Sequence, residues 1–301
     1  MPGYLGETLA VLSALSFALF NIVISRTSGS KGDKGVLFSV LITIAFSFTL
    51  FLVLEAGRLD LSASRDTVIG LGSFALAGIA AMMFGRTLVF DSIRRLGVTR
   101  ASAVKRLNPF FSVLLAAFFL SETVTRFDLM GLLLIAFAFG ILINDSFRKG
   151  HTNTKQPPPI AYMIGATAAF AYAIAYIFRK SGLNYMDAPA FGTFISALSG
   201  FLGFTFLAII LKSYRPMFKT LFVNIDRNIM GAAVLVSLGQ ILMFTALAYE
   251  KVSTVVMISS LEVFFSIFLS TIVFRIEARP GLLIMVAVAL AIIGVLMVAA
   301  A

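Results

Sequence analysis

Two adjacent cations, Lys105 and Arg106, stand near the front of the apolar run of residues 101–120, and Asn108 and Pro109 follow them. A cation at the centre of a membrane helix costs about 2.5–3.5 kcal/mol on insertion scales, and a proline leaves one backbone carbonyl of its helix without a donor. Both features are tolerated only where protein or water lies against them. We therefore predict that this segment faces an aqueous cavity inside a membrane and lines the path of a substrate.

Arg86 and Glu262 also stand inside apolar runs. Intramembrane charges of this kind mark a binding site, a proton relay or a salt bridge. If they share a cavity with Lys105 and Arg106, the cations suit a carboxylate or phosphate and the acid suits an amine. The pattern therefore favours an anionic or zwitterionic substrate. The alternatives are that Lys105 and Arg106 extend to the membrane interface, and that Arg86 forms a buried ion pair with Glu262 or Asp91.

The composition places these charges in a polytopic membrane protein. Of the 301 residues, 59% are hydrophobic and 13% are charged, and the mean hydropathy is +1.00. The net charge of +10 comes from basic residues dispersed among apolar segments, which is typical of topology signals rather than of a nucleic-acid surface. The chain has no cysteine, and its one histidine, His151, lies in a polar stretch. We expect no disulfide, no metal, no cofactor and no imidazole catalysis.

Ten apolar segments are long enough to cross a bilayer. They cover residues 7–25, 35–55, 67–90, 98–120, 127–144, 160–178, 188–211, 227–248, 252–274 and 280–300. The first lacks the basic start and cleavage site of a signal peptide, so we expect it to be retained. The long polar stretch 145–159 ends in three prolines and is typical of a linker. We expect an all-α protein with five spans in residues 1–144 and five in residues 160–301.

The two halves resemble each other at a shift of 154 residues. That shift aligns Phe90 with Phe244, Leu107 with Leu261, Phe111 with Phe265, Ser112 with Ser266 and Leu115 with Leu269. Because each half has an odd number of spans, the two copies must enter the membrane in opposite senses. Inverted repeats of this kind occur in many secondary transporters, whose site lies at mid-membrane between the repeats.

The same shift brings polar positions of the two halves to matching depths. It pairs Lys105 with Ser259, Arg106 with Ser260, Asn108 with Glu262 and Arg86 with Gln240. Asn21, Tyr172 and Tyr176 are further polar positions on the first and sixth spans; for these and for Gln240, helix packing is the alternative interpretation. We predict that the substrate-binding set comprises Asn21, Arg86, Lys105, Arg106, Asn108, Tyr172, Tyr176, Gln240, Ser259 and Glu262.

A loose motif occurs once in each half. It comprises Ala101, Ala103, Leu107, Pro109-Phe110-Phe111, Leu120-Ser121-Glu122-Thr123, Gly131 and Gly140, and then Val255, Leu261-Glu262-Val263-Phe264-Phe265, Glu277 and Gly294. It resembles the EamA-type repeat of the drug/metabolite transporter superfamily. The resemblance implies ten helices in two inverted repeats that move small metabolites or drugs without ATP hydrolysis, and a loop-fixing role for Glu122 and Glu277. Val263 stands where the first copy has Pro109, so the motif does not predict a matching proline break in the second repeat.

We therefore expect a secondary transporter, and not an enzyme, for an amino acid or an organic or phosphorylated anion, working by alternating access from a central cavity. A multidrug or lipid-linked-sugar transporter would need more aromatic faces and fewer deep cations. A membrane enzyme acting on lipids would need paired acids for magnesium, or a histidine near the interface. The expected partners are the substrate, the lipid bilayer of a bacterial cytoplasmic membrane and, in a weaker interpretation, a coupling proton at Glu262; no nucleic acid is expected.

The basic residues also predict an orientation. Loops after odd-numbered spans carry more than twice as many Lys and Arg as loops after even-numbered spans. The positive-inside rule then places the odd loops in the cytoplasm and both termini outside. The superfamily resemblance implies cytoplasmic termini instead, and we follow the charge count. A reporter fused after Ala301 tests the choice: alkaline phosphatase activity is expected, and fluorescence of a green fluorescent fusion would place the terminus inside.

Overall fold

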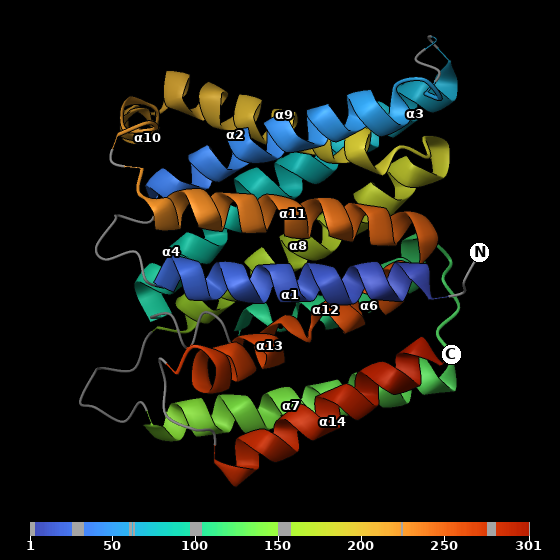
Figure 1. Cartoon of the computed structure of the whole chain (residues 1–301), viewed down its shortest axis with the longest axis vertical. Coiled ribbons are helices and arrows are strands. Elements are labelled where there is room, and N and C mark those ends of the chain that lie inside the picture. The colour runs from blue at the N-terminus through green and yellow to red at the C-terminus, as the bar shows by residue number, and fades with distance from the viewer. Residues whose placement is uncertain are drawn as a thin grey trace.

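The protein is a bundle of long helices that run roughly side by side (Figure 1). The computed structural model describes residues 4–25, 33–59, 62, 64–96, 104–149, 158–223, 225–275 and 281–300. In these residues nine helices are long and apolar enough to cross a membrane, and the shorter apolar helix Asn108–Phe119 supplies the remaining predicted span. The same residues contain no β-strand. The expectation of an all-α polytopic protein is confirmed.

Each half contributes five spans. The first half contains α1 (Leu5–Ser25), α2 (Asp33–Leu50) with the π-helical η1 (Phe51–Glu55), α3 (Arg65–Gly78) with the π-helical η2 (Ile79–Gly85) and α4 (Arg86–Leu96), then α6 (Asn108–Phe119) and α7 (Arg126–Lys149). The second half contains α8 (Pro159–Tyr185), α9 (Pro189–Ile210), the short η3 (Lys212–Tyr214) and α10 (Arg215–Lys219), α11 (Arg227–Tyr249), α12 (Val252–Ser259), α13 (Glu262–Phe268) with η4 (Leu269–Val273), and α14 (Leu282–Ala299).

Two helices extend further than the hydropathy pattern predicts. α7 continues to Lys149, so the start of the predicted linker is helical, whereas His151 and most of the linker lie outside the described residues. α8 continues to Tyr185 although its predicted end was residue 178. Of the two adjacent cations at which the predicted span ended, Lys180 binds the backbone of the second half: its Nζ donates to the carbonyl oxygens of residues 247 and 250 at 2.7 and 2.9 Å.

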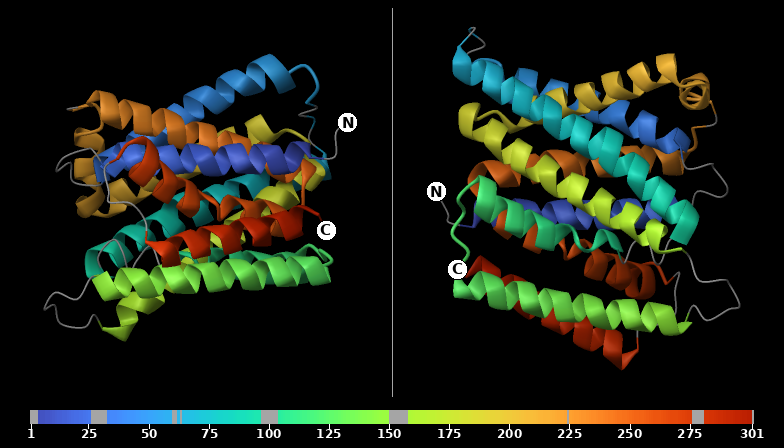
Figure 2. Two further views of the ribbon diagram at one scale, coloured as in Figure 1. Left: turned by 60° about the horizontal axis from the view of Figure 1, so that its bottom comes forward. Right: turned by 180° about the vertical axis from the view of Figure 1, so that it is seen from behind.

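The packing of the spans has two-fold symmetry. α1 packs on α11 and α3 packs on α8, which pairs the first span with the eighth and the sixth with the third. α2 packs on α9, α6 on α12 and α7 on α14, each against its own counterpart. Since each span and its copy are five positions apart in the order of spans, the copies cross in opposite directions. The total of ten spans is even, so both ends of the chain lie at the same end of the bundle (Figures 1 and 2). The predicted inverted repeats are confirmed.

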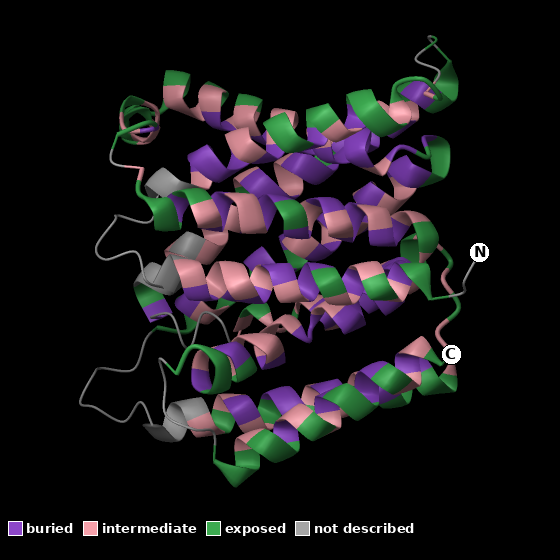
Figure 3. Ribbon diagram, in the orientation of Figure 1, coloured by how far each residue is buried: buried purple, intermediate pink, exposed green. Residues whose placement is uncertain are grey.

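The surface of the bundle suits lipid. Outward faces of α7, α9 and α14 carry exposed large apolar side chains, among them Phe137, Phe206 and Leu296. The buried residues concentrate on the helices between them (Figure 3). An apolar outer face over an apolar core is what a membrane-spanning bundle requires, because lipid is as apolar as the interior.

The fourth and ninth spans are each interrupted at the same level. In the fourth, residues 104–105 are helical, residues 106–107 form a turn and α6 follows. In the ninth, α12 ends, residues 260–261 form a turn and α13 follows. The two turns lie 154 residues apart, which is the shift that relates the repeats.

The backbone hydrogen bonds at the two turns also match. The N–H of Leu107 donates to the carbonyl of Val104 at 3.0 Å, and that of Leu261 donates to Ile258 at 3.0 Å. Both span three residues instead of the four of an α-helix, so each helix tightens before it restarts. The interruption is therefore a property of both repeats.

Proline is not needed for the second interruption. Pro109 has no N–H, and Val263 at the equivalent position donates only to the carbonyl of Ser260, at the long distance of 3.4 Å. The sequence motif did not predict this second break, because it took the proline as the signal. The structure therefore has matching breaks in both repeats, one followed by a proline and one by a valine.

Two carboxylates join the repeats at the end of the bundle that holds the termini. Glu122 accepts from the N–H groups of residues 252 and 253, the start of α12, at 2.7 and 3.1 Å. Glu55 accepts from the N–H groups of residues 190 and 191, the start of α9, both at 2.8 Å. Each carboxylate caps a helix of the opposite repeat. The loop-fixing role of Glu122 is confirmed, and Glu277 lies outside the described residues.

The matched breaks predict that Val263→Pro is tolerated. The substitution removes only the 3.4 Å bond of a residue whose counterpart is already proline. Phe265→Pro is the control, because it removes a well-formed bond of 2.9 Å to Leu261, and a proline in a helix interior costs about 3 kcal/mol. Thermal unfolding of purified protein in detergent should therefore leave V263P near the parent and lower F265P. Equal losses in both variants would contradict the account of the break.

Candidate functional site

Polar side chains of four spans meet beside the two interrupted helices. α6 packs on α12, α1 packs on both α12 and α13, and α8 packs on α6. The turns of the fourth and ninth spans thus face each other, with the first and sixth spans beside them. The predicted residues of these spans are brought into one region by the fold.

Glu262, the first residue of α13, is held by α1. Its Oε1 accepts a hydrogen bond from Asn21 Nδ2 at 2.8 Å, and the same nitrogen lies 3.4 Å from Ser266 Oγ. Both Asn21 and Glu262 are half-buried. The amide of Asn21 therefore orients the carboxylate through an interhelical hydrogen bond, a contact that the helix-packing interpretation of this asparagine also expects.

Arg106 lies in the turn of the fourth span and is directed into the protein. Its guanidinium carbon is 5.0 Å from the centre of the Phe139 ring. The Glu262 carboxylate is near enough to act on it electrostatically, yet in the described part of the chain no ion pair joins the two. The Nη1 of Arg106 is buried and has no hydrogen-bond partner. These contacts favour the cavity interpretation of this arginine over its extension to the membrane interface.

Lys105 and Asn108 face α8. Lys105 Nζ is 5.8 Å from the centre of the Tyr172 ring, and the lysine is exposed. Asn108 Nδ2 donates to the backbone oxygen of Ala169 at 3.0 Å. Asn108 therefore fastens the fourth span to the sixth, whereas the lysine ammonium stands above an aromatic face and remains accessible.

One face of α8 carries Tyr172, Tyr176 and Arg179, at spacings of four and three residues. Arg179 is 3% exposed, and its guanidinium carbon lies 4.8 Å from the Phe244 ring centre and 5.4 Å from that of Tyr176. Tyr176 is within electrostatic reach of both Arg179 and Glu262. This face therefore links the carboxylate to a second buried guanidinium.

Sequence reasoning missed Arg179. The hydropathy pattern ended the sixth span before Arg179 and Lys180 and assigned both to a loop, which the structure contradicts. The available signal was the spacing, because Arg179 falls on the helical face of the two tyrosines that the sequence did single out.

Arg86 lies at the edge of this region, at the first residue after η2. Its Nη1 donates to the Val36 carbonyl at 3.4 Å and to Ser39 Oγ at 3.5 Å, both long contacts to α2. Its charge acts on Arg179. Asp91, which the sequence offered as an ion-pair partner for Arg86, binds Arg95 at 2.9 Å.

Gln240 and Ser259 complete the predicted set. Ser259 ends α12 beside the break, and its hydroxyl is buried without a hydrogen-bond partner. Gln240 is half-buried on α11, and the contacts of the described residues do not join it to the charged groups. The structure therefore brings Ser259 to the break, whereas a binding role for Gln240 stays a prediction.

We call Arg86, Lys105, Arg106, Arg179 and Glu262 the charged cluster. Within the described residues the cluster holds four cations and one carboxylate, so its charges do not balance. In a low-dielectric interior such an excess favours the entry of a negative group. The arrangement suits the binding of a small charged molecule.

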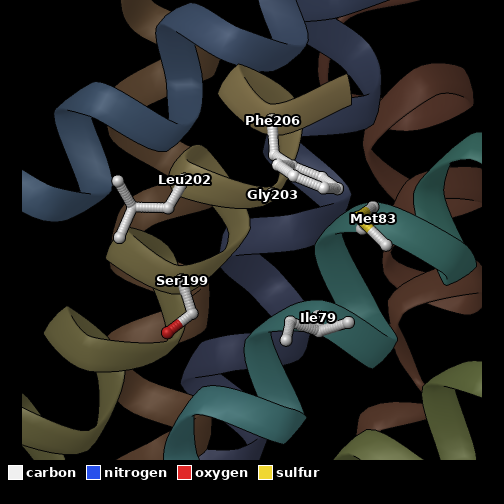
Figure 4. A pocket seen from close by; sticks show the side chains of 6 residues that line it. All are labelled: Ile79, Met83, Ser199, Leu202, Gly203 and Phe206. Atoms are coloured by element: carbon white, nitrogen blue, oxygen red, sulfur yellow. The ribbon is translucent and has the colours of Figure 1, made fainter. Parts of the chain in front are cut away.

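A separate groove lies on the outer surface between η2 and α9 (Figure 4). It has a volume of about 360 Å³ and is lined by Ile79, Met83, Ser199, Leu202, Gly203 and Phe206. Leu202 and Phe206 are largely exposed, and no charged side chain lines the groove. This groove is lined almost entirely by apolar side chains and does not suit a charged substrate.

Known proteins share this architecture. The EamA-like transporter family model matches residues 4–144 and 159–300. The "Probable amino-acid metabolite efflux pump" of Escherichia coli (strain K12) is 30% identical over 128 residues, which is 42% of this chain and 41% of that protein. A crystal structure of a protein that is 16% identical superposes with a TM-score of 0.72 over 97% of this chain and 95% of that chain, which supports the fold alone. Since the family model covers almost the whole sequence, the chain belongs to the EamA-like transporter family, a family of multi-pass membrane transporters.

Proposed function

We propose that this transporter carries a small metabolite with both a carboxylate and an amine, of the amino-acid type. The carboxylate binds Arg106 and the ammonium group binds Glu262. The cargo occupies a central position between the two repeats and reaches either side of the membrane by alternating access.

One observation carries the proposal: opposite charges on two interrupted helices act on each other without touching. Arg106 has a buried, unpartnered Nη1 and no ion pair with Glu262 in the part of the chain described. If this were a structural salt bridge, the low dielectric would favour direct contact between the two groups. A cargo bearing both charges fits between them and forms a charge-assisted hydrogen bond with each.

The Escherichia coli relative supports the cargo class, since its name assigns it to amino-acid metabolites and to efflux. We propose export as the direction for this chain as well. Because the matched region covers less than half of each protein, the charges at the breaks carry more of the proposal than the relative does.

The helix caps support a mechanism for opening. Glu122 and Glu55 each bind the start of a helix from the opposite repeat, at the end of the bundle that holds the termini. Opening toward that end requires these hydrogen bonds to break. The turns at residues 106–107 and 260–261 lack full α-helical bonding, so we propose that they absorb the bending.

Arg106→Gln and Glu262→Gln test the assignment. Removing one partner of a buried charge pair costs about 2–5 kcal/mol, so each variant should lose transport at least tenfold. The measurement is flux of radiolabelled amino acids in proteoliposomes, with cargo first chosen by a thermal-shift screen. Arg95→Gln is the matched control, because Arg95 forms an exposed pair with Asp91 away from the cluster.

R95Q should transport like the parent. Normal flux in both R106Q and E262Q, with normal expression and folding, would contradict the proposed site.

A further inference from the structure

We propose that Arg179 is a second anion-binding residue of the transport site, and that the preferred cargo is an amino-acid-type metabolite with a second acidic group and a net negative charge. This inference rests on the proposed function and adds to it. It is carried by a guanidinium that is buried and charged but has no acidic partner among the described residues.

The position of Arg179 connects it to the cargo site. It lies on the face of α8 that carries Tyr172 and Tyr176. Tyr176 is within electrostatic reach of both Arg179 and Glu262, and its ring lies 5.4 Å from the Arg179 guanidinium carbon. Arg179 is therefore connected through Tyr176 to the carboxylate that we assign to the ammonium group of the cargo.

The hydrogen bonding of Arg179 is incomplete. Its Nε is buried and has no partner, and its Nη1 reaches only the thioether sulfur of Met243, at 3.8 Å. A thioether is a weak acceptor. The rings of Phe244 and Tyr176 offset part of the charge but accept no hydrogen bond in the plane of the guanidinium.

A buried arginine is normally paired, because an isolated ion in the interior is unfavourable. Lining aromatic rings orient the guanidinium while leaving its edge free, and this edge matches a carboxylate in a bidentate arrangement. A purely structural arginine at 3% exposure would be expected to use its Nε on a carbonyl or carboxylate of the fold.

The charge balance of the cluster indicates how many negative groups the cargo brings. Glu262 acts on Arg106 and offsets its charge, whereas Arg86 adds positive charge near Arg179. A neutral zwitterion binds Arg106 with its carboxylate and Glu262 with its ammonium group, so it has no negative group left for Arg179. A cargo with a second acidic group satisfies Arg179 as well.

The experiment compares two ligands that differ in one charge. L-glutamate and L-glutamine have nearly the same shape, and only glutamate has a negative side chain. Apparent Kd values are measured by concentration-dependent thermal shift of the full-length protein in detergent, and by competition for transport in proteoliposomes. The variants are Arg179→Gln, Arg179→Lys and the surface control Arg95→Gln.

The parent and R95Q should bind glutamate at least about tenfold more tightly than glutamine, because a buried charge-assisted pair is lost with the neutral ligand. In R179Q the two affinities should approach each other, through weaker glutamate binding with glutamine binding unchanged. R179K should keep part of the preference, since it retains the charge without the planar fork. If R179Q does not fold, the test is the preference of the parent protein for glutamate over glutamine and its partial loss in R179K.

A parent protein that does not distinguish glutamate from glutamine would overturn the inference, and so would an R179Q variant that weakens both ligands equally. A small inorganic anion is the other source of negative charge at Arg179. Stabilisation of the parent by chloride over gluconate, abolished in R179Q and without a glutamate preference, would also overturn it.

The proposed function fails by a different result, namely normal binding of glutamine by R106Q and E262Q. A loss of glutamine binding in those variants, with no charge preference at Arg179, would leave the proposed function in place and reject only this inference.

Discussion

The cost of holding charge in a low-dielectric interior is the constraint on which the rest of the structure depends. Arg106, Arg179 and Glu262 lie where neither lipid nor an apolar core would stabilise them. The protein stabilises these charges only partly: the Asn21 amide donates to the Glu262 carboxylate, and aromatic rings lie against the two guanidinium groups. It leaves hydrogen-bonding capacity on both arginines unused. A transport site requires such a balance, because full internal pairing would exclude the cargo and no pairing would destabilise the fold.

The architecture explains how charges from distant parts of the chain come together. Two inverted repeats place the fourth and ninth spans against each other, and each span is interrupted at the same position. The interruptions bring Arg106 and Glu262 to the ends of short helical segments. At the end of the bundle that holds the termini, Glu122 and Glu55 bind helix starts of the opposite repeat. The caps fix the ends of these helices, and the interruptions both position the charged side chains and provide places where the helices can bend.

Much of this fold was predictable from the sequence. Hydropathy predicts ten spans, and the internal alignment with an odd number of spans in each half predicts two inverted repeats. The interior position of Glu262 was predictable, because apolar residues of one long span stand on both sides of it, whereas Arg106, directly after Lys105, left an interface position open. Arg179 was missed, because two adjacent cations at the end of an apolar run resemble a loop and only its helical spacing from Tyr172 and Tyr176 argued otherwise. The break at residues 260–261 was missed because no proline marks it in the sequence.

The central claim is that a water-accessible pocket lies at the two breaks, and the native chain offers a direct test because it has no cysteine. Single cysteines are introduced by Ser259→Cys beside the second break and by Leu114→Cys on the outer face of α6, where the leucine is 67% exposed. The measurement is the rate of labelling by a charged methanethiosulfonate in intact membranes, with and without excess cargo. The account predicts that S259C is labelled and protected by cargo while L114C in lipid is unreactive. An S259C variant as unreactive as the lipid-facing control would contradict it.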